Sequence, residues 1–118
     1  MPHRVIWFDI PVSDLDRAIG FYSHVLSAKV EKQFPGQPVA VIEHGESDVS
    51  GCLHQSEDRP SDHGPLLYFN VQGRLDDALA QAERYGGRVL KAKHQIGPYG
   101  WRAVILDSEG NRIALHSE

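Results

Sequence analysis

Three side chains in strand-like segments of this sequence are candidates for proton transfer. Asp9 lies in the first such segment, and His54 and His116 end two later ones. A carboxylate and an imidazole at a partly apolar surface, which moves their pKa values toward neutrality, can act as general base and general acid. Asp9 with His54 is the best candidate pair. In the alternative interpretation Asp9 only fixes a strand end, and His116 is a half-exposed polar residue.

The single cysteine, Cys52, lies two residues before His54. Side chains alternate along a strand, so these two residues share a face. A thiol whose pKa is lowered by a neighbouring histidine is a nucleophile. The alternative is a small buried thiol, because free cysteine is among the most buried residue types. A lone cysteine forms no internal disulfide and no Cys-rich zinc site, which favours a reducing compartment.

Four aromatic side chains suit a flat organic ligand through stacking and edge hydrogen bonds, namely Trp7, Tyr68, Tyr99 and Trp101. Tyr99 lies in the segment 97–100, whose flanking glycines would let a loop close over a cleft. In the alternative interpretation Trp7 belongs to the core and the segment 97–100 is only a hairpin loop.

Several other functions find no support in the motifs. The glycines show no GxGxxG or GxxxxGK spacing, so no nucleotide cofactor is predicted. No HxH or HExxH spacing predicts a metal site among the remaining histidines, His3, His24, His44, His63 and His94. The net charge is −4 without a Lys/Arg cluster, which predicts no nucleic-acid partner. No apolar stretch approaches the ~20 residues of a membrane span, and Met1–Arg4 lack a leader-like pattern. The sequence therefore predicts a cytoplasmic protein with a small-molecule or protein partner.

A length of 118 residues fits a single domain. Runs of β-branched and aromatic residues predict strands, and apolar residues at helical spacing predict helices. In the first half we expect a strand over 5–12, a helix over 15–26 and strands over 29–33, 39–43 and 49–54. In the second half we expect a strand over 66–71, a helix over 75–85 and strands over 88–92, 101–106 and 112–116. Ser13 with Asp16 predicts the cap of the first helix, and Gly86 with Gly87 the end of the second.

The second half thus repeats the first, displaced by about 60 residues. The repeat predicts an α+β fold of two tandem βαβββ modules in one domain over 1–118. Module one covers about 3–56, a polar linker about 57–64, and module two about 65–118. Neither half has enough core to be stable alone, so the halves must pack on each other or on another subunit.

Three segments carry a resemblance to a known family, namely IPVSDLDRAIGFYSHVLSAKV, YFNVQGRLDDALAQAERYGGRVL and LDSEGNRIALHS. In this order they resemble the vicinal oxygen chelate superfamily, which holds glyoxalase I, extradiol dioxygenases, fosfomycin-resistance enzymes and bleomycin-resistance proteins. They look most like its small glyoxalase-like branch. The resemblance covers nearly the whole chain, and it implies cupped mixed sheets around a cleft, usually within a homodimer.

The resemblance also implies where a metal would be bound. Family enzymes place one ligand on the first strand and one on the last strand of each module. The corresponding positions here are Trp7, Cys52, Leu66 and Ala114. Only the thiol of Cys52 suits a divalent cation. We therefore predict that the family metal is lost and that no cofactor is bound.

Residues two positions from these sites share their face, which places Asp9, His54, Tyr68 and His116 on the same inner surface. The predicted function is the binding of a small organic molecule in an aromatic-lined cleft of a homodimer, without metal. The predicted ligand-binding residues are Trp7, Cys52, Leu66, Tyr68, Tyr99, Trp101 and Ala114. The alternative is a metal-independent isomerase- or lyase-like enzyme that uses Asp9, His54 and His116 for proton transfer. Fold-level analogy does not choose between them.

Overall fold

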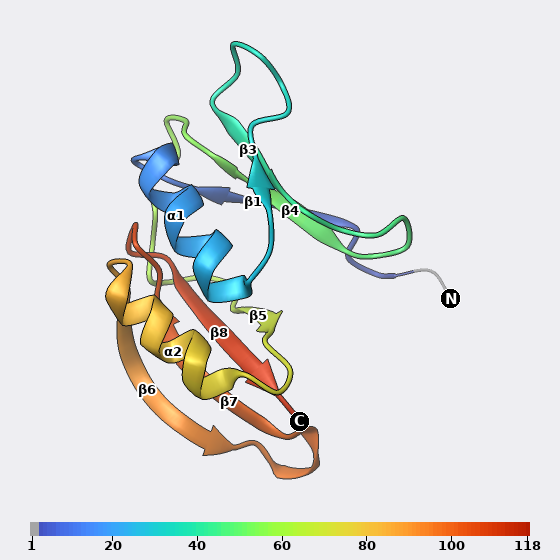
Figure 1. Cartoon of the computed structure of the whole chain (residues 1–118), viewed down its shortest axis with the longest axis vertical. Helices are drawn as coiled ribbons and strands as arrows, with labels where there is room; N and C mark the ends of the chain where they lie inside the picture. The colour runs from blue at the N-terminus through green and yellow to red at the C-terminus, as the bar shows by residue number, and fades with distance from the viewer. Residues whose placement is uncertain (1–2) are drawn as a thin grey trace.

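The computed structural model describes residues 3–118, so Met1 and Pro2 of the opening segment lie outside it. The elements follow each other along the chain as drawn in Figure 1: β1 (Trp7–Pro11), α1 (Leu15–Leu26), β2 (Val30–Glu31), β3 (Val39–Ile42), β4 (Ser50–His54), β5 (Leu67–Asn70), α2 (Leu75–Arg84), β6 (Arg88–Gln95), the 3-10 turn η1 (Gly97–Tyr99), β7 (Trp101–Leu106) and β8 (Arg112–Ser117). Within residues 3–118, no helix combines the length and the apolar composition needed to cross a membrane.

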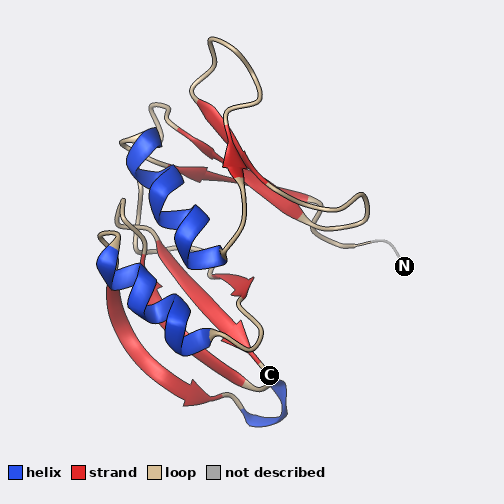
Figure 2. Cartoon of the chain, in the orientation of Figure 1, coloured by secondary structure: helices blue, strands red, loops and turns tan. Residues whose placement is uncertain are grey.

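The strands form two four-stranded mixed sheets with the orders β1-β4-β3-β2 and β5-β8-β7-β6 (Figure 2). The pairs β1 with β4 and β5 with β8 are parallel, and all other neighbouring strands are antiparallel. The registers correspond, because Asp9 pairs with Cys52 in one sheet and Tyr68 pairs with Ala114 in the other. The α+β fold of two βαβββ modules that the sequence predicts is therefore confirmed.

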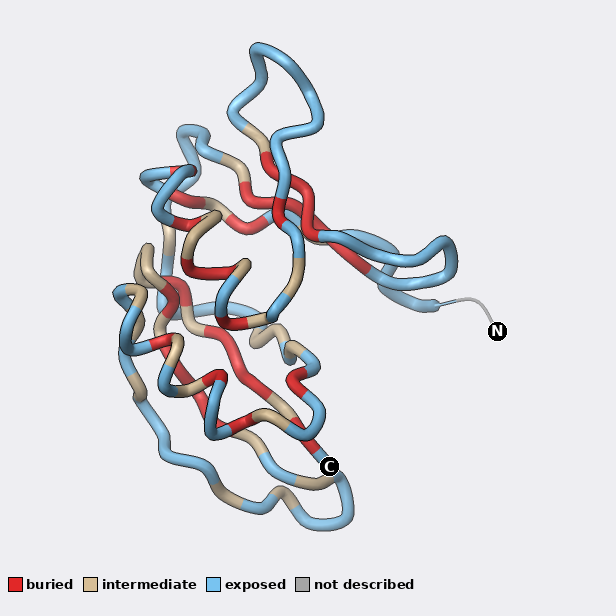
Figure 3. Tube along the Cα trace, viewed as in Figure 1, coloured by how far each residue is buried: buried red, intermediate tan, exposed pale blue. Residues whose placement is uncertain are grey.

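Each helix covers one face of its own sheet with an apolar stripe. The buried residues of the stripes are Leu15, Ala18, Phe21, Tyr22 and Val25 in α1 and Leu75, Ala78 and Ala82 in α2. The two helices also pack on each other, and Figure 3 shows the buried residues gathered where helices and sheets meet. Phe69 of module two lies with its ring centroid 5.8 Å from those of Phe8 and Tyr22 in module one. The modules therefore share one core within the chain.

Two predicted boundaries are wrong. The cap of α1 is Asp14 rather than Ser13, since Asp14 Oδ1 accepts a hydrogen bond from the backbone N–H of Arg17 at 3.0 Å. Strand β6 continues to Gln95 instead of ending at residue 92, because the first residue of β7, Trp101, pairs with Gln95. The other strand ends agree with the prediction or differ from it by one or two residues.

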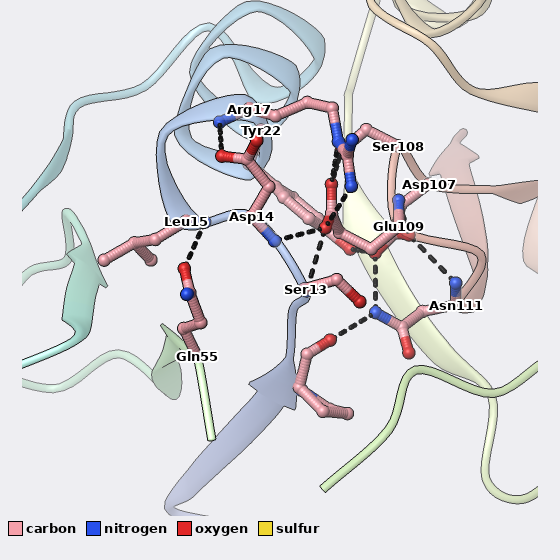
Figure 4. Close-up of polar contacts among 11 residues, drawn as sticks. Ser13, Asp14, Leu15, Arg17, Tyr22, Gln55, Asp107, Ser108, Glu109 and Asn111 are labelled. Atoms are coloured by element: carbon pink, nitrogen blue, oxygen red, sulfur yellow. Dashed lines mark hydrogen bonds and ion pairs between the residues drawn. The ribbon is translucent and has the colours of Figure 1, made fainter. Parts of the chain in front are cut away.

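A group of polar residues joins the two modules at the start of α1, and we call it the clamp: Arg17, Tyr22, Asp107, Glu109 and Asn111 (Figure 4). The Glu109 Oε1 atom accepts hydrogen bonds from the backbone N–H groups of Ser13 at 2.9 Å and Asp14 at 2.8 Å. The guanidinium of Arg17 pairs with the same carboxylate at 2.7 Å. Burial raises the pKa of Glu109, but these hydrogen bonds outweigh it and hold that pKa below its ordinary value.

Asp107 supplies the buried half of the clamp. Its Oδ2 atom accepts hydrogen bonds from the Tyr22 hydroxyl and from the Asn111 amide, the latter at 3.0 Å. The Asn111 amide also donates to the backbone oxygen of Pro11 at 2.8 Å, which ties the end of β1 to module two. Burial, reinforced by the charge of Asp107, raises the pKa of Tyr22 well above its ordinary value, so its hydroxyl stays a donor. The clamp fixes how the two sheets are placed relative to each other.

Candidate functional site

The face of the first sheet that α1 does not cover carries a hydrogen-bonded trio of Trp7, Asp9 and Cys52. The Asp9 Oδ1 atom accepts from the indole N–H of Trp7 at 3.0 Å and from the Cys52 thiol at 3.1 Å. The Trp7 side chain contacts the His44 ring edge-on, with centroids 6.0 Å apart, and Trp7 stays 42% exposed. The alternative that Trp7 belongs to the core is therefore wrong, and strand alternation places these three residues on one face as expected.

The environment of Cys52 favours a neutral thiol. The residue is 6% exposed, and its sulfur contacts the carboxylate of Asp9 instead of the imidazole of His54. Burial, together with the hydrogen bond and the negative charge of Asp9, raises the pKa of Cys52 to about 11. This environment favours the alternative of a small buried thiol over a nucleophile activated by His54, because the thiolate is the reactive form.

This assignment predicts how Cys52 titrates. In the wild-type protein, thiolate absorbance and alkylation by iodoacetamide should rise only toward a pKa of about 11. Asp9→Asn removes the adjacent negative charge, so the pKa of Cys52 should fall toward the ordinary 9.0. Asp48→Asn, an exposed change on the turn before β4, is the matched control and should leave the titration unchanged. A wild-type midpoint below 9.0, or no response to Asp9→Asn, would contradict this account.

The structure does not join the three predicted proton-transfer residues. Asp9 and His54 share the helix-free face of the first sheet, but Asp9 pairs with Cys52 while His54 pairs with Pro11. Within residues 3–118, no hydrogen bond or salt bridge links Asp9 to His54 or to His116. His116 lies in the second sheet, where its Nε2 atom bonds to the backbone oxygen of Tyr99. The Asp9 Oδ2 atom accepts no hydrogen bond from any described residue.

The helix-free face of the second sheet carries the predicted residues Tyr68, Ala114 and His116. It also carries Arg102 on β7 and His94 on β6, which the sequence interpretation did not include. The Arg102 guanidinium donates to the Tyr68 hydroxyl and to His94 Nε2. Strand alternation predicts the position of Arg102 on this face when it is applied to β7 in the same way as to β5 and β8.

Two of the aromatic residues predicted to bind the ligand, Trp101 and Tyr99, lie away from this face. Trp101 follows the alternation of Ala103 and Ile105, which are core residues on the side of α2. The Lys93 ammonium lies 5.8 Å from the centroid of the Trp101 ring, and both residues line a hollow of about 380 Å³ beside the start of α2. Tyr99 is 73% exposed in η1 and reaches the helix-free face only through its backbone oxygen. Trp101 and Tyr68 therefore do not form one wall.

Two hollows at the junction of the modules take up other predicted residues. Asp9 lines a hollow of about 290 Å³ between β1, the linker and β8. Leu66 and Tyr68 line another, of about 410 Å³, between β5 and the starts of β1 and β4. Within residues 3–118, the predicted site residues are thus distributed over several hollows and both open sheet faces.

The four positions that the family resemblance assigns to metal ligands do not fit a divalent cation. The indole nitrogen of Trp7 is a hydrogen-bond donor already bonded to Asp9, the Cys52 thiol also donates to Asp9, and Leu66 and Ala114 are apolar. In the described part of the chain, His, Cys, Asp and Glu side chains nowhere gather in threes around a possible metal position. A catalytic metal needs several such ligands around one point.

Comparisons with known proteins agree with this architecture. The chain has 15% identity to a glyoxalase/bleomycin resistance protein from Albidiferax ferrireducens T118, with a TM-score of 0.81 over 98% of this chain and 99% of that chain. A lactoylglutathione lyase from Agrobacterium tumefaciens gives 17% identity and a TM-score of 0.65 over 98% and 94% of the two chains. A genomically encoded fosfomycin resistance protein from Listeria monocytogenes gives 13% identity and a TM-score of 0.73 over 100% and 95%.

These likenesses establish the fold, and a search of curated proteins finds no significant match. The sequence itself matches the family model of the Glyoxalase/Bleomycin resistance protein/Dioxygenase superfamily over residues 4–115. That match includes both helices and all strands apart from the last two residues of β8. With its tandem βαβββ modules, and with the segments IPVSDLDRAIGFYSHVLSAKV and LDSEGNRIALHS in contact at the clamp, the chain belongs to this superfamily.

Proposed function

We propose that the protein binds a small organic molecule on the helix-free faces of its sheets, without the metal of the family. One observation carries the proposal: the positions that the family resemblance assigns to ligands carry Trp7, Cys52, Leu66 and Ala114, and the trio of Trp7, Asp9 and Cys52 uses this face for hydrogen bonding. Exposed aromatic rings with a few oriented polar groups are typical of ligand sites. A shared fold does not identify the ligand, so we infer its class from the residues on these faces.

Ligand-detected NMR with three flat probes, benzoate, benzamide and benzylamine, tests this proposal. We expect at least one probe to bind and to weaken about 10-fold in Trp7→Ala or Tyr68→Ala, because an aromatic wall is lost. Phe34→Ala is the matched control, since Phe34 is also an exposed aromatic residue but lies in the loop after β2. The proposal fails if no probe binds, or if all three variants bind like the wild type.

The absence of the family metal is a separate prediction. Protein purified without chelator should contain far less than one equivalent of Zn, Ni, Mn or Fe per chain by elemental analysis. The physical reason is that indole, thiol and two aliphatic side chains do not form a divalent site. Stoichiometric metal that survives dialysis would contradict this prediction, and Asp9, His54 and His116 would then be the ligands to replace first.

We further propose a homodimer, located in the cytoplasm, where the free thiol of Cys52 stays reduced. Large apolar side chains are exposed around the start of β1, where Ile6 is 77%, Val5 57% and Trp7 42% exposed. Such patches mark interaction surfaces. Light scattering should give roughly twice the chain mass. Ile6→Asp should produce monomer, while Leu90→Asp, at an exposed position of β6, should not. A sharp wild-type monomer at micromolar concentration would refute the dimer.

A metal-independent isomerase- or lyase-like activity is the second candidate. The observation that favours it is the Asp9 carboxylate, which lines the hollow of about 290 Å³ and keeps its Oδ2 atom without a partner among residues 3–118. A carboxylate with one oxygen fixed and one available can take a proton from a bound molecule.

A further inference from the structure

We propose that the helix-free face of the second sheet is an oxyanion site in which Arg102 binds a carboxylate or phosphate-type group. This inference rests on the proposed function and adds the chemical class of the ligand. It follows from the register of four strands, from the partners of one guanidinium and from the charge around it.

The register aligns four polar side chains in one row across the sheet. His116 on β8 pairs with Asn70 on β5 and with Arg102 on β7, and Arg102 pairs with His94 on β6. Paired residues point to the same face of a sheet. In the next row Ala114 lies between Tyr68 and Val104 and is fully buried, whereas Tyr68, Asn70 and His116 line a hollow of about 340 Å³. The row therefore places Arg102 next to two residues of this hollow, His116 by strand pairing and Tyr68 by a hydrogen bond.

The guanidinium of Arg102 is oriented entirely by neutral groups. Its Nε–H donates to His94 Nε2 at 3.0 Å, one terminal nitrogen donates to the Tyr68 hydroxyl, and its carbon lies 5.9 Å from the centroid of the Tyr68 ring. The His94 Nδ1 atom bonds to the backbone oxygen of Ala92 at 2.8 Å. A carbonyl only accepts, so Nδ1 carries the hydrogen and His94 presents a lone pair to Arg102.

The charge of Arg102 is not compensated within the described chain. Arg17 and Arg74 pair with carboxylates, as do Lys32 and Lys93, but Arg102 forms no ion pair with any carboxylate of residues 3–118. Arg102 is half-buried in a protein of net charge −4, and its two hydrogen-bond partners, His94 and Tyr68, carry no negative charge. Its second terminal nitrogen has no partner among these residues. The site therefore offers a fixed positive charge with N–H groups available for an anion.

An oxyanion matches these donors better than a neutral or cationic group. Arginine recognises carboxylate and phosphate through paired, charge-assisted hydrogen bonds. The Tyr68 hydroxyl accepts from Arg102, so its own hydrogen is free to donate to the same anion. The half-exposed Tyr68 ring then lies beside the organic part of the molecule. The inferred ligand is a small organic acid whose anionic group lies against Arg102.

Calorimetric titration of the full chain with benzoate, phenylphosphonate and neutral benzamide tests this inference. Benzoate or phenylphosphonate should bind at least about 10-fold more tightly than benzamide, and Arg102→Gln should remove that advantage while binding of benzamide is unchanged. The stronger of the two anions distinguishes a carboxylate from a phosphate-type ligand. The matched control is Arg84→Gln, because Arg84 also lies over a tyrosine ring, 5.7 Å from the Tyr85 centroid, but on α2.

Arg102→Lys separates recognition from folding, since it keeps the charge but not the paired N–H groups. It should bind benzoate with intermediate affinity and melt within a few degrees of the wild type. If benzamide binds as tightly as the anions, and Arg102→Gln changes nothing, the oxyanion site is refuted while the proposed function stands. If none of these probes binds the wild type at all, the proposed function fails together with it.

Discussion

Replacing Asp107 with alanine is expected to lower the free energy of unfolding by about 3–5 kcal/mol. Asp107 is 2% exposed, and its carboxylate accepts from the Tyr22 hydroxyl, the Asn111 side chain and two backbone N–H groups. Alanine leaves these buried donors without an acceptor, and a buried unsatisfied polar group costs about 1–3 kcal/mol. The loss should exceed that of an ordinary buried methylene because several donors are affected together.

Urea unfolding, followed by circular dichroism, measures this loss. Asp48→Ala is the matched control, because within residues 3–118 the Asp48 side chain accepts only one hydrogen bond, from the backbone N–H of Gly45 at 2.8 Å, in an exposed turn of module one. The control should cost less than about 1 kcal/mol. Asp107→Asn keeps acceptor oxygen and should fall between the two. A loss below about 1 kcal/mol for Asp107→Ala would show that the clamp does not hold the modules together.

The sequence alone predicts the repeat, the order of the elements and the two faces of the first sheet. These features depend on local periodicity, which needs no knowledge of distant contacts. Side-chain alternation correctly places Trp7, Asp9 and Cys52 on one face, because β1 and β4 are regular and pair without a register shift. The core residues follow from the same periods, since each helix presents one apolar stripe to its sheet.

The clamp could not be predicted from local rules. Ser13 has the residue type and spacing of a helix cap, yet its backbone N–H donates to Glu109, which lies 96 positions later in the chain. Only the packing of the two modules brings that carboxylate to the start of α1. The segments IPVSDLDRAIGFYSHVLSAKV and LDSEGNRIALHS carry the family resemblance in the sequence, whereas their contact with each other is a property of the folded chain.

The position of Trp101 was missed for a different reason. The strand reads WRAVIL, in which apolar residues occupy both faces, so alternation of hydrophobicity does not reveal which face is covered. Arg102 is the one polar residue in this strand and marks the open face. Trp101 must then point toward α2, where it meets Lys93. A charged residue in an otherwise apolar strand is thus a better guide to the open face than the aromatic residues beside it.

Asp9→Asn is expected to separate catalysis from binding, with an effect of ~10²-fold or more on any proton transfer. Asparagine keeps an oxygen that can accept from Trp7 and Cys52, so the melting temperature should stay within a few degrees. If Asp9 takes a proton from carbon, the wild type should catalyse deuterium exchange from D₂O into hydroxyacetone, and Asp9→Asn should lose this exchange. NMR follows the exchange directly, and Asp48→Asn serves again as the control.

The opposite result identifies a binding protein. Without exchange in the wild type, the variant that should cost most is Trp7→Ala, because its ring supplies the exposed surface of the trio. His54→Gln then tests whether His54 takes part in the same proton transfer. Asp9 and His54 share a face but no hydrogen bond, so if both side chains act on one substrate, each substitution alone should lower the exchange rate. If Asp9→Asn abolishes exchange and His54→Gln does not, Asp9 works without that imidazole. If every variant keeps wild-type exchange, affinity and stability, this face is not the ligand site, and the second sheet with Arg102 must carry the binding alone.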